Sequence, residues 1–198
     1  MQLTSSQVLS ATGCSSLQEV KNINMWGKSL SDVSVVRQMP NVEVLSLSVN
    51  DISALLDFSF CQNLTELYLR KNKVSDLKQI RFLRELKNLR VLWMCSNPCA
   101  EKDIYRLYII HYLPQLTKLD NSDISDEERK AAATLDIPPS LVLNLNERKQ
   151  DQNHQEYPPI SMEQKDVLQG RTEGEAFKGN GWIYTEYCKS SLLSTSRT

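Results

Sequence analysis

One pattern recurs at intervals of about 22 to 25 residues, and it constrains the fold more than any other feature of the chain. In each copy, apolar residues stand at the first, fourth, sixth and eleventh places of a short segment, and the ninth place is usually asparagine. Four copies begin at Val20, Val42, Leu64 and Leu89, and Leu116 begins a fifth that stops after its first half. A repeat of this length indicates a solenoid, because one copy alone cannot bury its apolar face.

The fourth to sixth places predict a short β-strand in every copy. In Leu45-Ser46-Leu47 and Leu67-Tyr68-Leu69 the leucines alternate with other residues, and side chains two apart on a strand share one face. Beyond the strand, Ile52 with Leu55 and Val74 with Leu77 have helical spacing, which predicts helical or 3₁₀ segments on the convex side. The predicted fold class is an α/β leucine-rich repeat solenoid with short parallel strands on its concave face.

The asparagine at the ninth place has a predicted structural role. The chain turns sharply there, and an asparagine side chain can bond the backbone groups that the turn leaves unpaired. We therefore expect Asn50, Asn72 and Asn97 to stack as an asparagine ladder. The first copy carries Lys28 at this place, and lysine cannot accept a hydrogen bond, so the ladder is expected to begin in the second copy.

Both ends of the solenoid need caps, because a terminal repeat would otherwise expose leucines and strand edges. Residues 1–16 are predicted to be an N-terminal capping helix, with a capping box at Thr4-Ser5-Ser6-Gln7 that opens a helix over 5–12. After the repeats at 17–99, residues 100–137 are predicted to form a C-terminal cap, with a helix over 103–113 and a second that opens at Ser125. The polar segment 138–198 is predicted to be mostly disordered.

The concave face is the predicted binding surface, since the residues between the leucines project from it. Aromatic residues and arginine are enriched in interface hot spots because they bury a large area. The predicted protein-binding residues are Trp26, Ser46, Ser48, Tyr68, Arg70 and Trp93. The other outward-facing positions are Asn22, Asn24, Val44, Glu66, Val91 and Cys95, with Lys118 and Asp120 on the cap. In the alternative interpretation, the aromatic rings pack on neighbouring strands and bind nothing.

Charge and composition argue against other kinds of partner. The chain has 23 Lys and Arg against 24 Asp and Glu, and without a basic stripe direct contact with nucleic acid is not expected. No charged region followed by an apolar stretch opens the sequence, and no segment is long enough to span a bilayer, which predicts a cytosolic or nuclear location. In such a location the five cysteines are expected to stay reduced.

No enzyme, metal or cofactor chemistry is predicted. Cys95 and Cys99 are expected to point different ways in the repeat, and a structural zinc site needs four ligands. His111 falls on a cap helix and His154 in the polar segment, so neither is expected beside a nucleophile. The sequence has six glycines and no glycine-rich phosphate-binding motif, so nucleotide binding is not expected.

Two resemblances add to this interpretation. The run 113–121, after Tyr105-Arg106, resembles the cap that follows short repeats of the kind seen in protein phosphatase regulatory subunits. The segments 47–53, 66–72 and 89–99 resemble the cilia- and flagella-associated protein 410 family, over about residues 1–135. This second resemblance implies a non-enzymatic scaffold of the cilium, basal body or cytoskeleton that has a helical C-terminal region and a NIMA-related kinase as partner.

Three alternatives stay open at this point. The segment 170–198 shows no sustained apolar period, so we interpret the C-terminus as a variant end without the helical self-association region that the resemblance implies. A capped solenoid of this size is also similar to the leucine-rich subunit of a nuclear ribonucleoprotein particle, which would place the chain in the nucleus. A phosphatase regulatory subunit is the third alternative, and it rests on repeat type alone.

Overall fold

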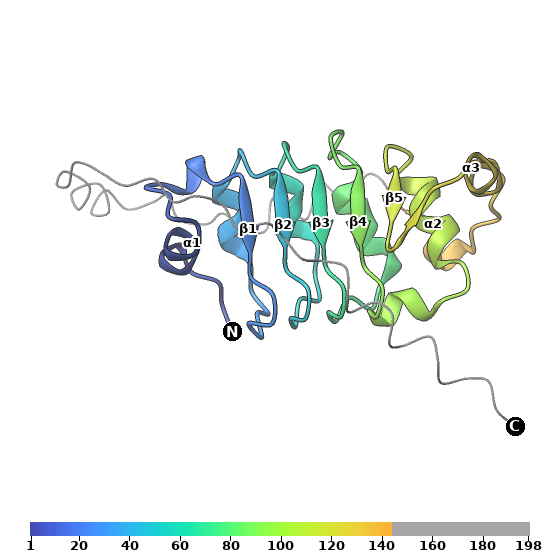
Figure 1. The fold of residues 1–198 in the computed structure, drawn as a ribbon. Helices are drawn as coiled ribbons and strands as arrows, with labels where there is room; N and C mark the ends of the chain where they lie inside the picture. Colours follow the sequence, from blue (N-terminus) through green and yellow to red (C-terminus); the bar gives the residue numbers. More distant parts are fainter. Residues whose placement is uncertain (144–198) are drawn as a thin grey trace, which may run out of the picture. The chain divides into compact units, whose positions relative to one another are not determined.

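The computed structural model describes residues 1–143, so the predictions made for 144–198, including the variant C-terminus, lie outside the described residues. Within the described part, the strands form a six-stranded sheet in the order β1-β2-β3-β4-β5-β6. Strands β1 to β5 are parallel and lie in a row, and β6 closes the sheet antiparallel to β5 (Figure 1). The strands are β1 Asn22–Asn24, β2 Val44–Ser46, β3 Glu66–Tyr68, β4 Val91–Trp93, β5 Lys118–Leu119 and β6 Ser122–Asp123.

The register of the strands places equivalent leucines side by side. Leu45 pairs with Ile23 and with Leu67, and Leu92 pairs with Leu67 and with Leu119. All five side chains are buried in one continuous core. Successive repeats therefore stack in one column, and the predicted leucine-rich repeat solenoid is confirmed.

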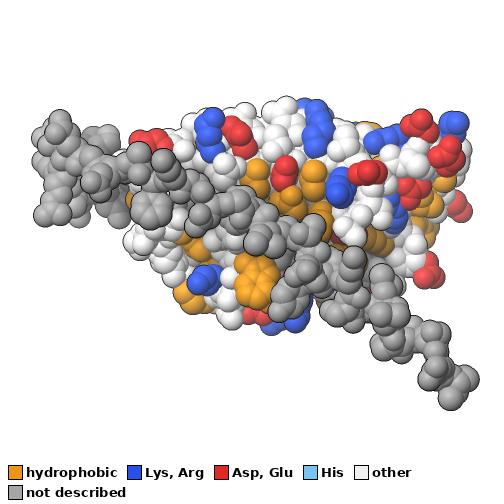
Figure 2. Space-filling view, in the orientation of Figure 1, with side chains coloured by type: hydrophobic (Ala, Val, Ile, Leu, Met, Phe, Trp, Pro, Cys, Tyr) orange, Lys and Arg blue, Asp and Glu red, His pale blue; other side chains and the backbone are white. Residues whose placement is uncertain are grey.

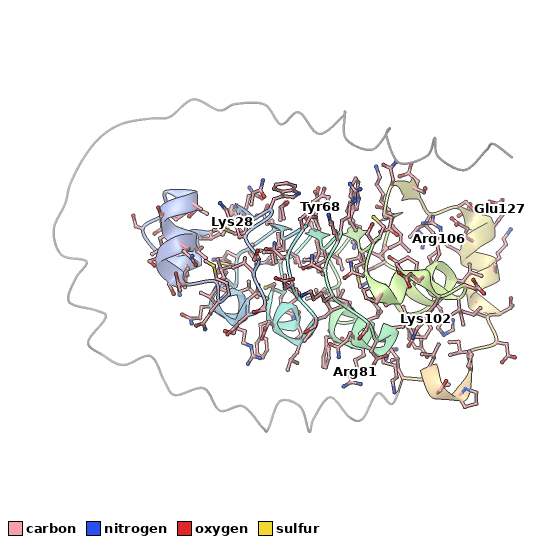
Figure 3. The ribbon with its side chains drawn as sticks, turned by 90° about the horizontal axis from the view of Figure 1, so that it is seen from below. Lys28, Tyr68, Arg81, Lys102, Arg106 and Glu127 are labelled. Carbon is pink, nitrogen blue, oxygen red and sulfur yellow. The ribbon has the colours of Figure 1, made fainter. Side chains whose placement is uncertain are left out.

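The side opposite the sheet consists of short 3₁₀ segments: η2 Ser34–Gln38, η3 Leu56–Phe60 and η4 Leu77–Leu83. Figure 3 shows the two sides, with Tyr68 on the side of the strands and Arg81 on the side of the 3₁₀ segments. Each segment sends apolar side chains inward, such as Phe58 from η3 and Ile80 from η4, and both are fully buried. The segments are five, five and seven residues long, so each makes only about two tight turns, and 3₁₀ helices usually occur in such short pieces.

The turn that follows each strand uses the same backbone conformation in every full repeat. Gly27, Val49, Lys71 and Ser96 have φ angles of 66°, 61°, 55° and 59°, and each stands just before the ninth place. This left-handed region is unfavourable for side chains with a Cβ, especially a β-branched one such as Val49. The turn is therefore held by bonds from outside it, and the asparagine ladder supplies them.

The N-terminal end is covered by α1, Ser5–Thr12. Thr4 and Gln7 form the predicted capping box, and Gly13 ends the helix in the left-handed conformation with φ 71°. The helix packs against β1 and buries Val8. The helix expected over 5–12 is thus present, and it shields the first repeat from water.

The C-terminal end is covered by α2, Tyr105–Tyr112, and α3, Asp126–Ala133, which pack against each other. Helix α2 lies within the range expected from the sequence, and Pro114 follows its end. Helix α3 begins at a capping box between Ser125 and Glu128. Both helices flank β5 at the end of the row (Figure 1).

The packed structure continues past residue 137, where the sequence analysis placed the start of a mostly disordered tail. Residues Pro139–Leu141 form the short segment η6, and Leu143 is buried. Two tyrosines of α2 hold this stretch, since the Tyr108 hydroxyl donates to the carbonyl of Leu141 at 2.8 Å and the Tyr112 hydroxyl accepts from the Leu143 amide at 3.3 Å. The packed stretch covers only the first six residues of the segment 138–198, and the rest of the predicted tail lies outside the described residues.

Candidate protein-binding face

The asparagine ladder holds the backbone beneath the candidate surface. The Asn72 amide nitrogen donates to the carbonyls of Leu47 and Leu69, both at 3.0 Å, and its oxygen accepts from the Ile52 amide at 3.0 Å. Asn97 repeats this arrangement on Leu69, Met94 and Val74, and Asn50 repeats it on Met25, Leu47 and Leu30. Asn50 also accepts from the backbone amide of Lys28, at 3.0 Å, so the first turn is held from the second repeat. Each asparagine joins two repeats, which fixes the spacing of the strands.

The surface itself is called the sheet face below. It comprises the outward residues of β1 to β4 and the residue two places after each strand: Asn22, Asn24, Trp26, Val44, Ser46, Ser48, Glu66, Tyr68, Arg70, Val91, Trp93 and Cys95. Figure 2 shows this side of the molecule, where hydrophobic side chains lie open to solvent between acidic and basic ones. The core of a protein interface is enriched in aromatic residues and arginine, and this face carries Trp26, Tyr68, Arg70 and Trp93.

An aromatic pair lies across the two central repeats of the sheet face. Tyr68 and Trp93 are opposite each other in the register of β3 and β4, and their ring centroids are 5.6 Å apart in an edge-to-face arrangement. The Tyr68 hydroxyl donates to the carboxylate of Glu66 on the same strand. Both aromatic side chains are half-buried, so part of each ring faces solvent. The rings pack on a neighbouring strand, as the alternative interpretation expected, and they also offer apolar area to a ligand.

Ser46 is less exposed to solvent than the sequence pattern predicts. It stands at an outward place of β2, but only 7% of it is exposed. In the register it lies between Asn24 and Tyr68, both of which are larger. A small side chain between larger ones is shielded from solvent, so Ser46 makes at most a minor contact with any ligand of this face.

The other predicted binding residues are more accessible. Trp26 is 59% exposed, and its amide nitrogen donates to the Asn24 side chain at 3.0 Å, which fixes the start of the turn. Ser48 and Arg70 occupy the equivalent place in the second and third repeats and are half-buried. The three side chains thus stand at the same edge of the sheet face, one per repeat.

Asp120 was expected to face outward from the cap, but it has a structural role. One carboxylate oxygen accepts from the amides of Met94 and Cys95, at 2.8 and 2.7 Å, and the other accepts from the Tyr105 hydroxyl at 3.0 Å. Asp120 therefore satisfies backbone donors at the end of β4 and ties them to α2. Burial and the neighbouring Asp120 carboxylate raise the pKa of Tyr105 far above its usual range, so this hydroxyl stays protonated and donates.

Two of the cysteines in the described part, Cys61 and Cys99, are buried. Cys99 is fully buried, whereas Cys95 is half-buried on the sheet face. Burial raises the pKa of the Cys99 thiol to about 11 and that of Cys61 to about 12. Over residues 1–143, no three His, Cys, Asp or Glu side chains gather in a group able to hold a metal ion. In the same residues, no helix has the length and apolar character to cross a bilayer.

A second polar row was missed by the sequence analysis. Asn41, Asn63 and Asn88 each precede the first apolar residue of a repeat, and each donates its side-chain amide to a carbonyl of the preceding repeat, at 2.8, 3.1 and 3.3 Å. The signal was present, since asparagine recurs at this place in three successive copies. These side chains are exposed, so they stabilise the stack less than the buried ladder does.

The comparison with known families decides what the repeats are. The family model described as leucine-rich repeat matches residues 13–136, which include all the strands and α2 and α3. This chain belongs to the leucine-rich repeat family. Proteins of this kind typically act as interaction scaffolds, and their variable outward residues decide what they bind.

Two curated relatives of this leucine-rich repeat protein confirm the resemblance inferred from the sequence. It is 43% identical over 130 residues to cilia- and flagella-associated protein 410 of Mus musculus, and 43% identical over 134 residues to the protein of the same name in Homo sapiens. These alignments cover 65% and 67% of this chain and 52% of each relative. The chain thus spans about half the length of the curated relatives that it matches.

A solved structure is similar in fold. The Drosophila melanogaster SNF/U2A′ complex contains a chain that matches with a TM-score of 0.55 and 19% identity, over 71% of this leucine-rich repeat protein and 95% of that chain. At this identity the likeness supports the solenoid architecture alone.

Proposed function

We propose that this chain is a non-enzymatic scaffold that binds a polypeptide on its sheet face. The observation that carries the proposal is the Tyr68–Trp93 pair, which lies half-exposed across neighbouring repeats with Arg70 two residues beyond Tyr68. Rigid aromatic side chains lose little conformational freedom on binding, so they are efficient anchors for another protein. The ladder beneath them holds the strands in one position before any ligand arrives.

The proposed location is the cilium or its basal body, among cytoskeletal structures. The support is the 43% identity to proteins named cilia- and flagella-associated protein 410, over 130 and 134 residues. A nuclear particle is the competing location. Tagging the chain in ciliated cells separates the two, because we expect a signal at the ciliary base, whereas a signal confined to the nucleus would contradict the proposal.

A NIMA-related kinase is the proposed partner. The support is again the resemblance to the ciliary family, and the sheet face is the surface that we assign to this contact. Binding of the purified kinase to the purified 198-residue chain tests the assignment. We expect saturable binding that is weakened by substitutions on the sheet face. Unchanged affinity in those variants would mean that the kinase does not contact the sheet face.

The role of the sheet face is tested by replacing Tyr68 and Trp93 together with alanine. We expect capture of the partner to fall by at least tenfold, because truncating a hot-spot aromatic typically costs about 2 kcal/mol of binding. Folding stability should fall by only about 1 kcal/mol, since the edge-to-face pair contributes that order and neither ring belongs to the buried core. Binding is measured by calorimetry and stability by urea unfolding.

Phe60→Ala is the matched control, because this aromatic residue is 41% exposed on η3, on the other side of the solenoid. It should leave partner capture unchanged. A loss of several kcal/mol of stability in the double variant would mean that the two rings are core residues. An equal loss of binding in Phe60→Ala would mean that the sheet face is not the specific binding surface.

A further inference from the structure

A small cleft lies away from the sheet face, where α2 packs against η4. Its volume is about 370 Å³, and it is lined by Arg84, Lys87, His111, Tyr112, Pro114 and Gln115. Arg84 and Lys87 come from the turn after η4, and the other four come from the end of α2 and the turn that follows it. The cleft is thus formed by the end of the third repeat and the C-terminal cap together.

The walls of the cleft are held in place. The Gln115 side-chain amide donates to the carbonyl of Leu86 at 3.1 Å, which joins the two turns. The Tyr112 ring packs edge-on against His111, with centroids 4.8 Å apart, and it packs on Tyr108 at the same distance. A ligand would therefore meet a site that is already formed, so little binding energy is lost in ordering it.

The lining is rich in hydrogen-bond donors and contains no acidic side chain among the described residues. Arg84 and Lys87 carry positive charge. The His111 ring bonds the carbonyl of Ala132 through Nδ1, at 2.7 Å, and because a carbonyl only accepts, the proton lies on Nδ1. In the neutral ring Nε2 is then an acceptor, so the positive charge and the donors for a phosphate come from Arg84 and Lys87.

Two nearby features oppose an anion here. Lys87 pairs with Glu85 at 3.4 Å, but Lys87 is 72% exposed and such a surface pair contributes little, so a ligand can displace it. The carboxyl end of α2 has a partial negative charge that favours cations. Two full positive charges outweigh this partial charge, and an arginine can bind the oxygens of a phosphate in a bidentate manner.

We propose that this cleft binds a phosphate monoester presented by a phosphorylated serine or threonine side chain of a partner protein. The size of the cleft suits a single side chain with its phosphate. A bilayer or a nucleic acid would require a broad basic surface, whereas these cations form a small group on a chain of formal net charge −1. The site is separate from the sheet face, so its failure would leave the proposed scaffold function untouched.

The test is a titration of the ¹⁵N-labelled 198-residue chain, followed by NMR, with N-acetyl-O-phosphoserine N-methylamide. Saturable shifts are expected for the amides at 84–87, 111–113 and 115, and N-acetylserine N-methylamide should cause none. The variant Arg84→Ala with Lys87→Ala should bind the phosphorylated compound at least tenfold more weakly. Lys102→Ala with Lys130→Ala is the control, since both lysines are exposed and outside the cleft, and it should bind like the wild type.

Three results would overturn the proposal. Shifts spread evenly over the surface would mean that the compound binds non-specifically to positive charge. Equal weakening in the control variant would mean the same. Binding of vesicles that contain phosphatidylserine through Arg84 and Lys87, with no binding of the phosphoserine compound, would assign these cations to a membrane. Thermal unfolding of both variants confirms that each is folded before the titration is compared.

Discussion

At the scale of single residues, each buried asparagine of the ladder stabilises the fold through several hydrogen bonds to the backbone. Asn72 is 6% exposed and bonds three backbone groups that belong to two repeats. Its removal leaves those groups buried without partners, and each such group costs about 1 to 3 kcal/mol. The ladder therefore contributes to stability as well as to the position of the sheet face.

Asn72→Ala should lower the free energy of unfolding by about 3 kcal/mol, which is the cost of leaving buried backbone groups unbonded. Asn63→Ala is the matched control, because Asn63 is exposed and donates only at the surface. It should cost less than about 1 kcal/mol. Urea unfolding followed by circular dichroism measures both, and equal losses would show that the ladder has no special role.

Residue identity alone predicted part of the candidate site. The alternation of leucines identified the outward-facing positions, because successive side chains of a strand point to opposite faces of the sheet. It could not predict that Ser46 is shielded between Asn24 and Tyr68, because shielding depends on the size of the residues on adjacent strands. It also could not show that Asp120 bonds the amides of β4, since that contact depends on how the cap closes.

At the scale of elements, Arg106 connects α2 to the rest of the C-terminal cap. Its guanidinium donates to both carboxylate oxygens of Glu128 on α3 and to the carbonyls of Leu119 and Asp123. Figure 3 shows Arg106 near the end of the molecule where Glu127 of α3 is labelled. One side chain thus joins α2, α3 and the β5–β6 pair, which explains why so short a cap is well packed.

The ion pair between Arg106 and Glu128 is expected to make folding stability depend on pH. The Arg106 guanidinium lowers the pKa of Glu128 to about 2, well below the ordinary value of about 4.3. A lowered folded-state pKa adds stability that is complete above the ordinary pKa and is lost as the pH falls toward 2. Glu128→Gln keeps the side-chain oxygen of the capping box but removes the charge, so it should lower stability by about 1 kcal/mol at pH 7 and by almost nothing at pH 2.

Stability curves from urea unfolding between pH 7 and 2 test this difference. Glu101→Gln is the control, because Glu101 is an exposed glutamate on the 3₁₀ segment η5, Pro98–Glu101, and its curve should run parallel to that of the wild type. A gap between Glu128→Gln and the wild type that stays constant down to pH 2 would show that the carboxylate charge is not what stabilises the cap.

Element types and positions were largely predictable, because repeats, capping boxes and proline positions are local signals. The helices expected over 5–12 and 103–113 appear as Ser5–Thr12 and Tyr105–Tyr112. Strand β6 was not predicted, since Ser122–Asp123 has no apolar pattern and pairs only because the chain turns back after β5. Segment η6 was missed for a similar reason, because tyrosine hydroxyls of α2 hold it.

At the scale of the whole molecule, the described part is a stack whose two ends are closed and whose one open face carries the aromatic pair. Closed ends prevent growth of the sheet by addition of another chain, and the sheet face stays open to a polypeptide partner. The convex side differs, since its exposed Phe60 lies under the Arg37 guanidinium, 5.1 Å from the ring centroid. We therefore assign the polypeptide contact of the proposed scaffold function to the sheet face, apart from the phosphate contact proposed for the cleft between α2 and η4.

Photo-crosslinking in ciliated cells tests this claim most directly. A crosslinking amino acid, p-benzoylphenylalanine, is placed at Ser48 on the sheet face or at Phe60 on the opposite side, one position per protein. We expect a discrete crosslinked protein from position 48, lost when Tyr68 and Trp93 are alanine, and none from position 60. The same discrete product from position 60, with none from position 48, would contradict it.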